Sequence, residues 1–470
     1  MNYRTIAVLI AVGWMAGCTV GPNYRRPVVQ VPQAFRAPDP LPAQHAESLA
    51  DLKWWEVFKD AELQQLVRTA LQHNYDLREA VARVEAARAN LGITRSDQFP
   101  QVGVSGDLQF TRLSRNGSFR LPGSLVQSQN RNWGEAFLDL LSFEVDIWGR
   151  LRRATEAARA TLLSTEEYRK AVVTTLVSDV ATAYITLRVL DYQLEIARRT
   201  LETRRASLQL VQSRQGGGVA TLVDLRQAEE LVHTAAEIIP SLQQQTEQTE
   251  NQISLLLGEN PRAVIRQGRF NDDLFPPEVP TGLPSALLER RPDIRAAEQN
   301  LIAANAEIGV ARAAYFPRLS LSGSLGGQSS QLSSLFSGPN RAWSFVPQIT
   351  QPIFTAGRIR STVKFAEAQR DISLIQYQKT IQTAFTDVSN ALIARQRVRE
   401  RRVQQEALVA AIEDRKRLAY VRFRGGVDTM LNALDADREL LQAELDLKEL
   451  KLNELLSVVQ LYKALGGGWQ

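Results

Sequence analysis

A duplication of about 210 residues constrains this chain more than any other feature of its sequence. The segment YDLREAVARVEAARANLGITRSDQFPQVGVSGDL (75–108) aligns without a gap on PDIRAAEQNLIAANAEIGVARAAYFPRLSLSGSL (292–325), 217 positions later. Further along the chain the offset settles at 208, so that RQGGGVATL (214–222) matches RFRGGVDTM (422–430). Any fold for this chain must therefore contain one order of elements twice.

Each copy begins with a helical pattern and then changes to a strand pattern. In the first copy, apolar residues at helical spacing predict a helix from about Trp54 to about Arg95. In both copies this helix should end at a Phe-Pro pair, because proline disfavours helical geometry in the residue before it. Apolar and polar residues then alternate, which predicts a β-hairpin over 101–146 and another over 318–353.

A long helix follows each predicted β-hairpin. No helix-breaking residue interrupts 151–215 or 359–424, and about 65 residues at about 1.5 Å each make a helix about 100 Å long. The glycine-rich stretch after each long helix predicts a tight turn, because glycine tolerates the left-handed geometry that ends helices. Each copy should therefore contain a helical hairpin whose tip carries the repeated glycines.

Return helices complete the two hairpins. Thr221 and Thr429 are placed to cap them, and the expected ranges are 222–257 and 430–465. Pro240 lies inside the first of these ranges and predicts a kink there.

The N-terminus predicts secretion and lipidation. Residues 1–17 contain one arginine and an apolar run that is too short to span a membrane stably, and they end in small residues before Cys18. This pattern favours a signal peptide followed by a lipidated Cys18, the alternative being an ordinary signal with an incidental cysteine. Residues 18–53 hold several prolines and little periodicity, which predicts an extended leader. No other stretch reaches 18 apolar residues, so we expect no second membrane helix.

Composition and charge favour a folded protein that does not bind nucleic acid. The chain is 44% hydrophobic and 23% charged, which is typical of folded proteins. Its net charge is +5, but Lys and Arg are interspersed with Asp and Glu, as on solvated helix faces. With Cys18 as the only cysteine, an intramolecular disulfide is excluded.

No motif in the sequence predicts catalysis or a cofactor. There is no P-loop, no dinucleotide-binding glycine motif after a strand, and no nucleophile elbow. The acidic pair Asp272-Asp273 lies in a proline-bounded linker (261–283), where solvation is the simpler interpretation. We therefore expect no enzymatic activity and no cofactor. The histidines begin no metal-ligand pattern; they are His45, His73 and His233.

The predicted helical hairpins and strands need other chains to pack against. A helical hairpin about 100 Å long cannot bury its apolar stripe within one chain, and such stripes usually pack against other helices, as in coiled coils. Four strands are too few to close a barrel, and open strand edges in a membrane leave backbone groups unpaired. Association of several copies solves both problems. A soluble β-hairpin lid on a helical bundle is the alternative interpretation of the strands.

Six short segments, spread along the chain, are distinctive in their order. They are CTVGPNY (18–24), WW (54–55), FEVDIWGRLRR (143–153), QPIFTAGRIR (351–360), FRGGVDTMLNALDADRELL (423–441) and LYKALGGGW (461–469). Together with the duplication, they resemble the outer-membrane factor family, the TolC-like channels. The resemblance is strongest to the lipoprotein branch of the OprM/NodT type, which serves resistance-nodulation-division efflux pumps, and it covers essentially all of the mature chain.

The resemblance implies a fold and a function. The fold class is mainly α with a transmembrane β-barrel part: a TolC-like homotrimer in which four strands per chain make a twelve-stranded barrel above a coiled-coil α-barrel. The chain would lie in the outer membrane, held also by its lipid, and extend into the periplasm. It would be the passive exit duct for drugs or other small toxic compounds. Its partners would be a periplasmic adaptor and an inner-membrane resistance-nodulation-division transporter, with no enzymatic step.

The resemblance also implies a gate. In lipoprotein members the narrow entrance is ringed by the segment that here reads LNALDADR, which contains Leu431, Asp435 and Arg438. Threefold repetition would make an apolar ring and an acidic ring, both of which can gate a pore. Arg422 would hold the closed state through an ion pair between helices. The alternative for Asp435 and Arg438 is a surface pair on one helix. The sequence does not give the orientation of Asp437.

The hairpin tips would contact the adaptor, although they can also be read as mere turns. The tip residues are Arg214, Gly217, Gly218, Val219 and Thr221 in the first copy and Arg424, Gly425, Gly426, Val427 and Thr429 in the second.

We expect the chain to be organised as two repeats behind its leader. The first repeat is 54–260, with its tip near 214–221, and the second is 284–470, with its tip near 424–429. A non-pore periplasmic coiled-coil adaptor or envelope-tethering lipoprotein is the rival function. The repeated alternating strands argue against it, because such proteins need no apolar girdle.

Overall fold

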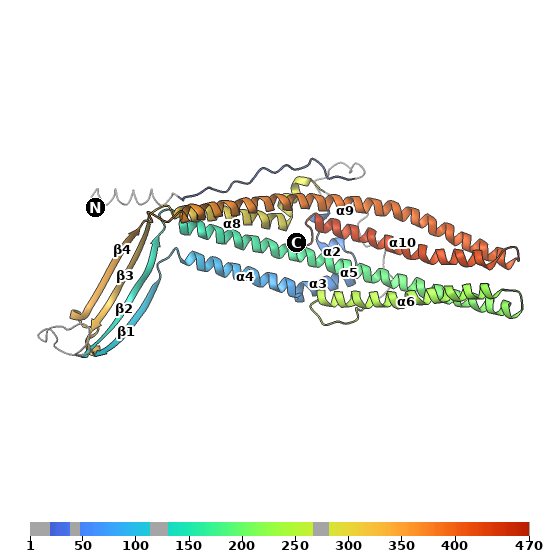
Figure 1. Ribbon diagram of the computed structural model, residues 1–470, viewed down its shortest axis with the longest axis horizontal. Coiled ribbons are helices and arrows are strands. Elements are labelled where there is room, and N and C mark those ends of the chain that lie inside the picture. The colour runs from blue at the N-terminus through green and yellow to red at the C-terminus, as the bar shows by residue number, and fades with distance from the viewer. Residues whose placement is uncertain (1–18, 38–47, 113–129, 267–281, 470) are drawn as a thin grey trace. The chain divides into compact units, whose positions relative to one another are not determined.

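The computed structural model describes residues 19–37, 48–112, 130–266 and 282–469. The described chain is mainly helical and contains one antiparallel sheet (Figure 1). It divides into two compact units, each of which draws on both repeats. The first consists of Met1–Val28, Val84–Thr165 and Ala297–Tyr377, and the second of Val29–Arg83, Glu166–Ala296 and Gln378–Gln470.

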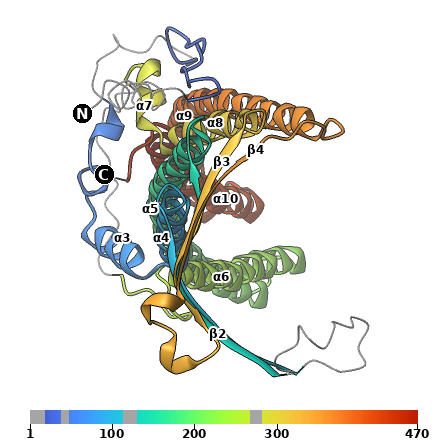
Figure 2. The same cartoon turned by 90° about the vertical axis from the view of Figure 1, so that its left-hand side faces the viewer.

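The sheet belongs to the first unit and follows the order β1-β2-β3-β4. Its strands lie side by side as one curved layer (Figure 2). The two β-hairpins join through β2 and β3, where Leu138 lies opposite Leu325, and a register shift follows between Leu140 and Phe143. The strands are β1 (Val102–Arg112), β2 (Asn130–Val145), β3 (Arg318–Ser329) and β4 (Arg341–Thr350).

Two helical hairpins of equal length follow the strands. Each long helix has 67 residues and each return helix has 35, as the duplication requires. Gly218 and Gly426, with φ of 76° and 73°, take the left-handed geometry that lets the chain leave the long helices. The helices are α5 (Arg150–Gly216), α6 (Leu222–Leu256), α9 (Arg358–Arg424) and α10 (Met430–Ala464).

The expected continuous helix from Trp54 to Arg95 is wrong. The structure has α2 (Trp54–Val57), α3 (Ala61–His73) and α4 (Tyr75–Ser96) instead. The break before α4 lies at buried Asn74, whose Oδ1 accepts a hydrogen bond from the Leu77 backbone N–H at 2.9 Å and so caps α4. Its Nδ2 donates to the Leu256 carbonyl at 3.0 Å, which ties this break to the end of α6.

The second repeat has a similar break. A short turn, η2 (Pro284–Ala286), leads into α7 (Leu287–Arg290), and α8 (Pro292–Ala313) starts after Arg291. Pro292 opens α8, where its missing N–H is not needed. The remaining short helices are η1 (Leu49–Asp51) and, between β3 and β4, η3 (Leu332–Ser334) and η4 (Gly338–Asn340).

The return helix α6 contains Pro240 and continues to Leu256, which agrees with the expected range 222–257. One sequence expectation about helices needs qualification. The sequence predicts no second membrane helix, yet α5 contains an 18-residue window apolar enough to cross a membrane. Two thirds of that window is buried in the structure, as in the core helix of a folded protein.

The main core lies in the second unit around the middle of α5. Val177, Val180 and Tyr184 of α5 are almost completely buried there, together with Val67 of α3 and Leu461 of α10. Aromatic packing and hydrogen bonds fix the C-terminal end of the chain on this core. The Tyr462 ring lies 6.0 Å from that of Phe58, and its hydroxyl donates to the Leu52 carbonyl at 2.9 Å.

Candidate functional site

The first hairpin tip is built by a reciprocal cap. The Thr221 hydroxyl accepts from the Asp224 backbone N–H at 3.1 Å, and the Asp224 carboxylate accepts from the Thr221 N–H at 2.8 Å. This capping box satisfies two backbone donors at the start of α6. Just before the tip, the Arg214 guanidinium lies 4.6 Å from the centroid of the Phe423 ring, a cation–π contact between the two hairpins.

The second tip has a different construction. Thr429 precedes α10, but its side chain makes no capping hydrogen bond. Asp428 is the acceptor instead, taking hydrogen bonds from Arg422 Nε at 3.0 Å, from the Thr429 N–H at 2.8 Å and from Asn432 Nδ2 at 2.8 Å. The Arg422 hydrogen bond, followed by that from Thr429, holds the pKa of the Asp428 carboxyl below its usual value. Within one chain, Arg422 near the end of α9 is thus bonded across its own tip to Asp428, just before α10.

The predicted gate residues lie together on the exposed side of α10. Leu431 is 51% exposed, and Arg438 pairs with Asp435 at 2.6 Å in the i, i+3 geometry of a surface helix pair. At about 100° per residue, Leu431, Asp435 and Arg438 fall within about 100° of one another around the helix. The structure therefore brings all three to one face, which a pore lumen or bulk solvent can equally contact.

Asp437 points the opposite way, into the helical bundle. Its side chain is 2% exposed and accepts from Arg204 Nε of α5 at 2.8 Å. The Lys416 ammonium of α9 contacts its other oxygen. Sequence reasoning missed Arg204 and Lys416, although Asp437 does stand in the apolar spacing that marks the buried face of α10.

A groove runs between α5 and α9 near the tips. It is open on one side, and its lining is partly apolar, with Leu210, Tyr420, Val421 and Phe423, and partly charged, with Arg424 among others. Several tip residues carry exposed side chains, including Val219 at 69% and Val427 at 67%. Groove and tips together offer a surface with apolar groups and with charges of both signs, because Glu413 and Asp414 also line the groove.

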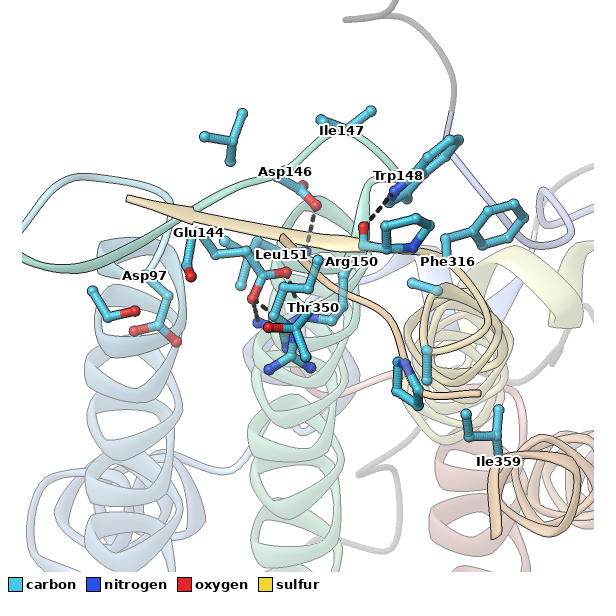
Figure 3. Close-up of a pocket in the computed structure, with 18 of the residues that line it drawn as sticks. Asp97, Glu144, Asp146, Ile147, Trp148, Arg150, Leu151, Phe316, Thr350 and Ile359 are labelled. Atoms are coloured by element: carbon cyan, nitrogen blue, oxygen red, sulfur yellow. Dashed lines mark hydrogen bonds and ion pairs between the residues drawn. The ribbon is translucent and has the colours of Figure 1, made fainter. Parts of the chain in front are cut away.

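A second hollow lies in the first unit, where the sheet meets α5 (Figure 3). Three of its charged residues, Glu144, Asp146 and Arg150, make hydrogen bonds at this corner. Arg150 makes two 2.8 Å hydrogen bonds to Glu144, which raise the pKa of the Arg150 guanidinium. Asp146 accepts from the Leu151 and Arg152 backbone N–H groups at 3.1 and 2.9 Å, so it caps α5. Trp148 stacks on Phe316, with ring centroids 4.6 Å apart.

The FEVDIWGR motif therefore shapes the corner between strand and helix. Gly149, with φ of 79°, turns the chain there, and the charged residues around it hold the start of α5.

The described ranges contain no group of three or more His, Cys, Asp or Glu residues that could hold a metal ion. His73 lies in α3 and His233 in α6. Several residues singled out in the sequence lie outside the described residues, namely Cys18, His45, Asp272 and Asp273.

Comparison with known proteins gives a consistent result. The model of the outer membrane efflux protein family matches residues 66–259 and 283–467. The probable efflux pump outer membrane protein TtgC of Pseudomonas putida is 38% identical to this chain, over 100% of the chain and 96% of TtgC.

Solved structures agree. A membrane protein from Pseudomonas aeruginosa gives a TM-score of 0.88 at 35% identity, over 96% of this chain and 100% of that one. The open state of the MtrE outer membrane channel of Neisseria gonorrhoeae gives a TM-score of 0.86 at 32% identity, over 96% and 99% of the two chains.

Proposed function

Because this chain belongs to the outer membrane efflux protein family, we propose that three copies form the exit duct of a tripartite pump for small toxic compounds. Membership makes the chain an efflux channel of the outer membrane that extends into the periplasm. The rival function, a non-pore adaptor or tether, gains no support, because the relatives are outer membrane efflux proteins and channels.

The observation that carries the trimeric duct is the open sheet. Among the described residues, β1 and β4 pair on one side only, so the sheet ends in two free edges. Free edges are costly in a bilayer, where backbone groups need partners, and closure into a barrel removes them. The edge strands also expose large apolar side chains, among them Phe110 at 75% and Trp343 at 76%, which suit a lipid-facing surface.

Strand length supports the same assembly. The strands run from 10 to 16 residues, and a tilted transmembrane strand needs about 9–11. Three chains of four strands each would supply a twelve-stranded barrel. The 67-residue helices α5 and α9 would continue it as a periplasmic tube.

Partners follow from the surfaces at the tips. The groove between α5 and α9, with exposed Val219 and Val427 beside it, fits an adaptor that docks with apolar and charged groups. An inner-membrane transporter of the resistance-nodulation-division type would supply the energy. Lipidation at Cys18, after removal of residues 1–17 as a signal peptide, would add a lipid anchor to the barrel.

Leu431 and Asp435 would narrow the entrance of this duct. Threefold repetition places three leucines and three carboxylates around one axis, and both kinds of ring restrict ion flow. The Asp435–Arg438 pair would hold each carboxylate in place on its helix.

Conductance tests this assignment. The double variant Leu431→Ala, Asp435→Ala should conduct about tenfold more than the wild-type trimer in planar bilayers, because both rings are removed. Leu255→Ala, at an exposed leucine near the far end of α6, is the control and should conduct like wild type. Absence of conductance in every form would contradict the duct. Equal, measurable conductance in wild type and double variant would contradict only the gate.

A further inference from the structure

Asp437 occupies a core position of α10 that apolar residues otherwise fill. The buried residues of this stretch recur at spacings of three and four, the spacing of a helix seam that packs against neighbours. Asp437 is the only charged residue among them. They are Met430, Ala433, Leu434, Ala436, Asp437, Leu440 and Leu441, each no more than 9% exposed.

Asp437 is part of a junction that involves all four helices of the two hairpins. Figure 1 labels these helices, α5, α6, α9 and α10. Arg204 of α5, itself 3% exposed, donates to the Asp437 carboxylate at 2.8 Å and to its backbone carbonyl at 3.3 Å. The same guanidinium donates to the Leu231 carbonyl of α6 at 2.8 Å. Lys416 of α9 brings its ammonium to the second carboxylate oxygen.

This junction fixes how the helices can be aligned. A buried charge is tolerated only with its partners, and removing one partner leaves the other charge buried and unpaired. If α10 slid or rotated against α5 and α9, an apolar side chain would face Arg204 and Lys416. A single polar residue in a helix seam is a known means of setting register.

The fixed register decides where the proposed gate points. At about 100° per residue, Asp435 lies about 160° from Asp437 around α10, and Leu431 lies about 120° from it. Anchoring Asp437 toward the bundle therefore turns Asp435 and Leu431 outward, where they are exposed.

We infer that Arg204, Lys416 and Asp437 are positioning residues for the gate: they hold α10 in the register that presents Leu431 and Asp435 to the lumen. The inference rests on the proposed duct. It assigns to Asp437 a role in alignment rather than in lining the pore.

The test separates alignment from stability. The triple variant Arg204→Met, Lys416→Met, Asp437→Leu replaces the buried ionic group with apolar side chains, a change that commonly preserves or raises stability. We expect trimers that melt at or above the wild-type temperature but conduct about tenfold more in planar bilayers, because the gate face is no longer held. A triple variant that melts like wild type and conducts like wild type would reduce the junction to a structural role and overturn the inference.

A milder variant tests the inference if the triple variant does not assemble. Lys416→Gln keeps the Arg204–Asp437 pair and should raise conductance about threefold, because one of two constraints on the carboxylate is lost. The matched control is Glu439→Gln, which removes an exposed α9–α10 ion pair to Arg415 (2.6 Å) two residues from Asp437. Conductance of Lys416→Gln equal to this control would also overturn the inference.

Asp435→Ala distinguishes this failure from failure of the duct. If Asp435→Ala raises conductance while the triple variant and Lys416→Gln do not, the gate stands and the junction has no aligning role. If no form conducts, the duct itself is wrong.

Discussion

The two hairpin tips share the sequence Gly-Gly-Val-x-Thr but start their return helices with different side-chain bonds. Thr221 shares a capping box with Asp224. The position three residues after Thr429 is Asn432, whose amide donates to Asp428. The reciprocal bond is therefore absent at α10, although threonine occupies the same place in both copies.

This difference predicts unequal effects of the same substitution. Thr221→Ala should destabilise the start of α6 by about 1 kcal/mol, because one N-terminal backbone donor loses its acceptor. Thr429→Ala, the matched control, should change the start of α10 by no more than a few tenths of a kcal/mol, since no capping bond is lost. Amide hydrogen exchange over the first turn of each return helix measures both effects. Equal acceleration at the two tips would contradict the cap assignment.

For the predicted site residues, the sequence indicates which of them share a helix face but not which partners they contact. Leu431, Asp435 and Arg438 lie within eight positions, so helical periodicity alone places them on one face. The orientation of Asp437 depends on Arg204, 233 positions earlier, and on Lys416 in another helix. A single sequence does not show which arginine pairs with Asp437, because the chain contains many arginines.

Long helices were the most predictable elements. α5 and α9 start and end within one residue of the uninterrupted ranges 151–215 and 359–424, because only glycine and proline stop so long a pattern. The break at Asn74 was missed because apolar periodicity continues across it. Asn74 also donates to the Leu256 carbonyl, 182 positions away, and this contact cannot be seen in the sequence.

A glycine that recurs in the two copies, in α4 and in α8, has different surroundings in each. Gly92 and Gly309 are counterparts in the duplication. Space around Gly92 is open, whereas a Cβ at Gly309 would lie 2.7 Å from the Val20 carbonyl oxygen. The leader is held at this point by backbone and side-chain bonds: Val20 N–H to the Trp148 carbonyl at 3.0 Å, and Asn305 Nδ2 to the Pro22 carbonyl at 2.9 Å.

Alanine substitutions at these glycines should therefore have opposite signs. Gly92→Ala should stabilise α4 by about 0.5–1 kcal/mol, since alanine favours an exposed helix. Gly309→Ala should displace the leader and cost about 1–3 kcal/mol, because its Cβ overlaps a backbone atom. Thermal unfolding gives the sign, and limited proteolysis between residues 19 and 36 reports release of the leader. Equal protease resistance in the two variants would show that Gly309 is not needed for docking.

At the scale of the whole chain, the two long helices are copies of one repeat but differ in which side chains they bury. Ala157 and Ser164 of α5 are buried, at 5% and 7%. Their counterparts 208 positions later, Phe365 and Ile372 of α9, are exposed at 65% and 58%, and Ile375 on the same side is exposed at 63%. One copy of the motif thus faces the chain's own interior, while the other presents a large apolar stripe outward.

The stripe argues for association rather than for a self-sufficient monomer. Contiguous large apolar side chains on a helix mark an interaction surface, and burying each contributes about 1.5–3 kcal/mol. In the proposed trimer a neighbouring copy covers it. Sequence alone indicated that the hairpins need neighbours, but both long helices carry apolar residues, so it did not indicate that α9 holds the stripe.

Ile372→Glu tests this assembly. A carboxylate in the centre of a covered stripe would be buried without a partner, at a cost of several kcal/mol, so the variant should be monomeric while its helix content stays unchanged. Arg360→Glu changes the charge of an exposed residue on the same helix, about a third of a turn from Ile372, and should remain trimeric. Native mass spectrometry in detergent counts the chains, and circular dichroism follows the helices. A trimeric Ile372→Glu would move the interface elsewhere on the chain, and a monomeric wild type would remove the duct, because four strands cannot close a barrel alone.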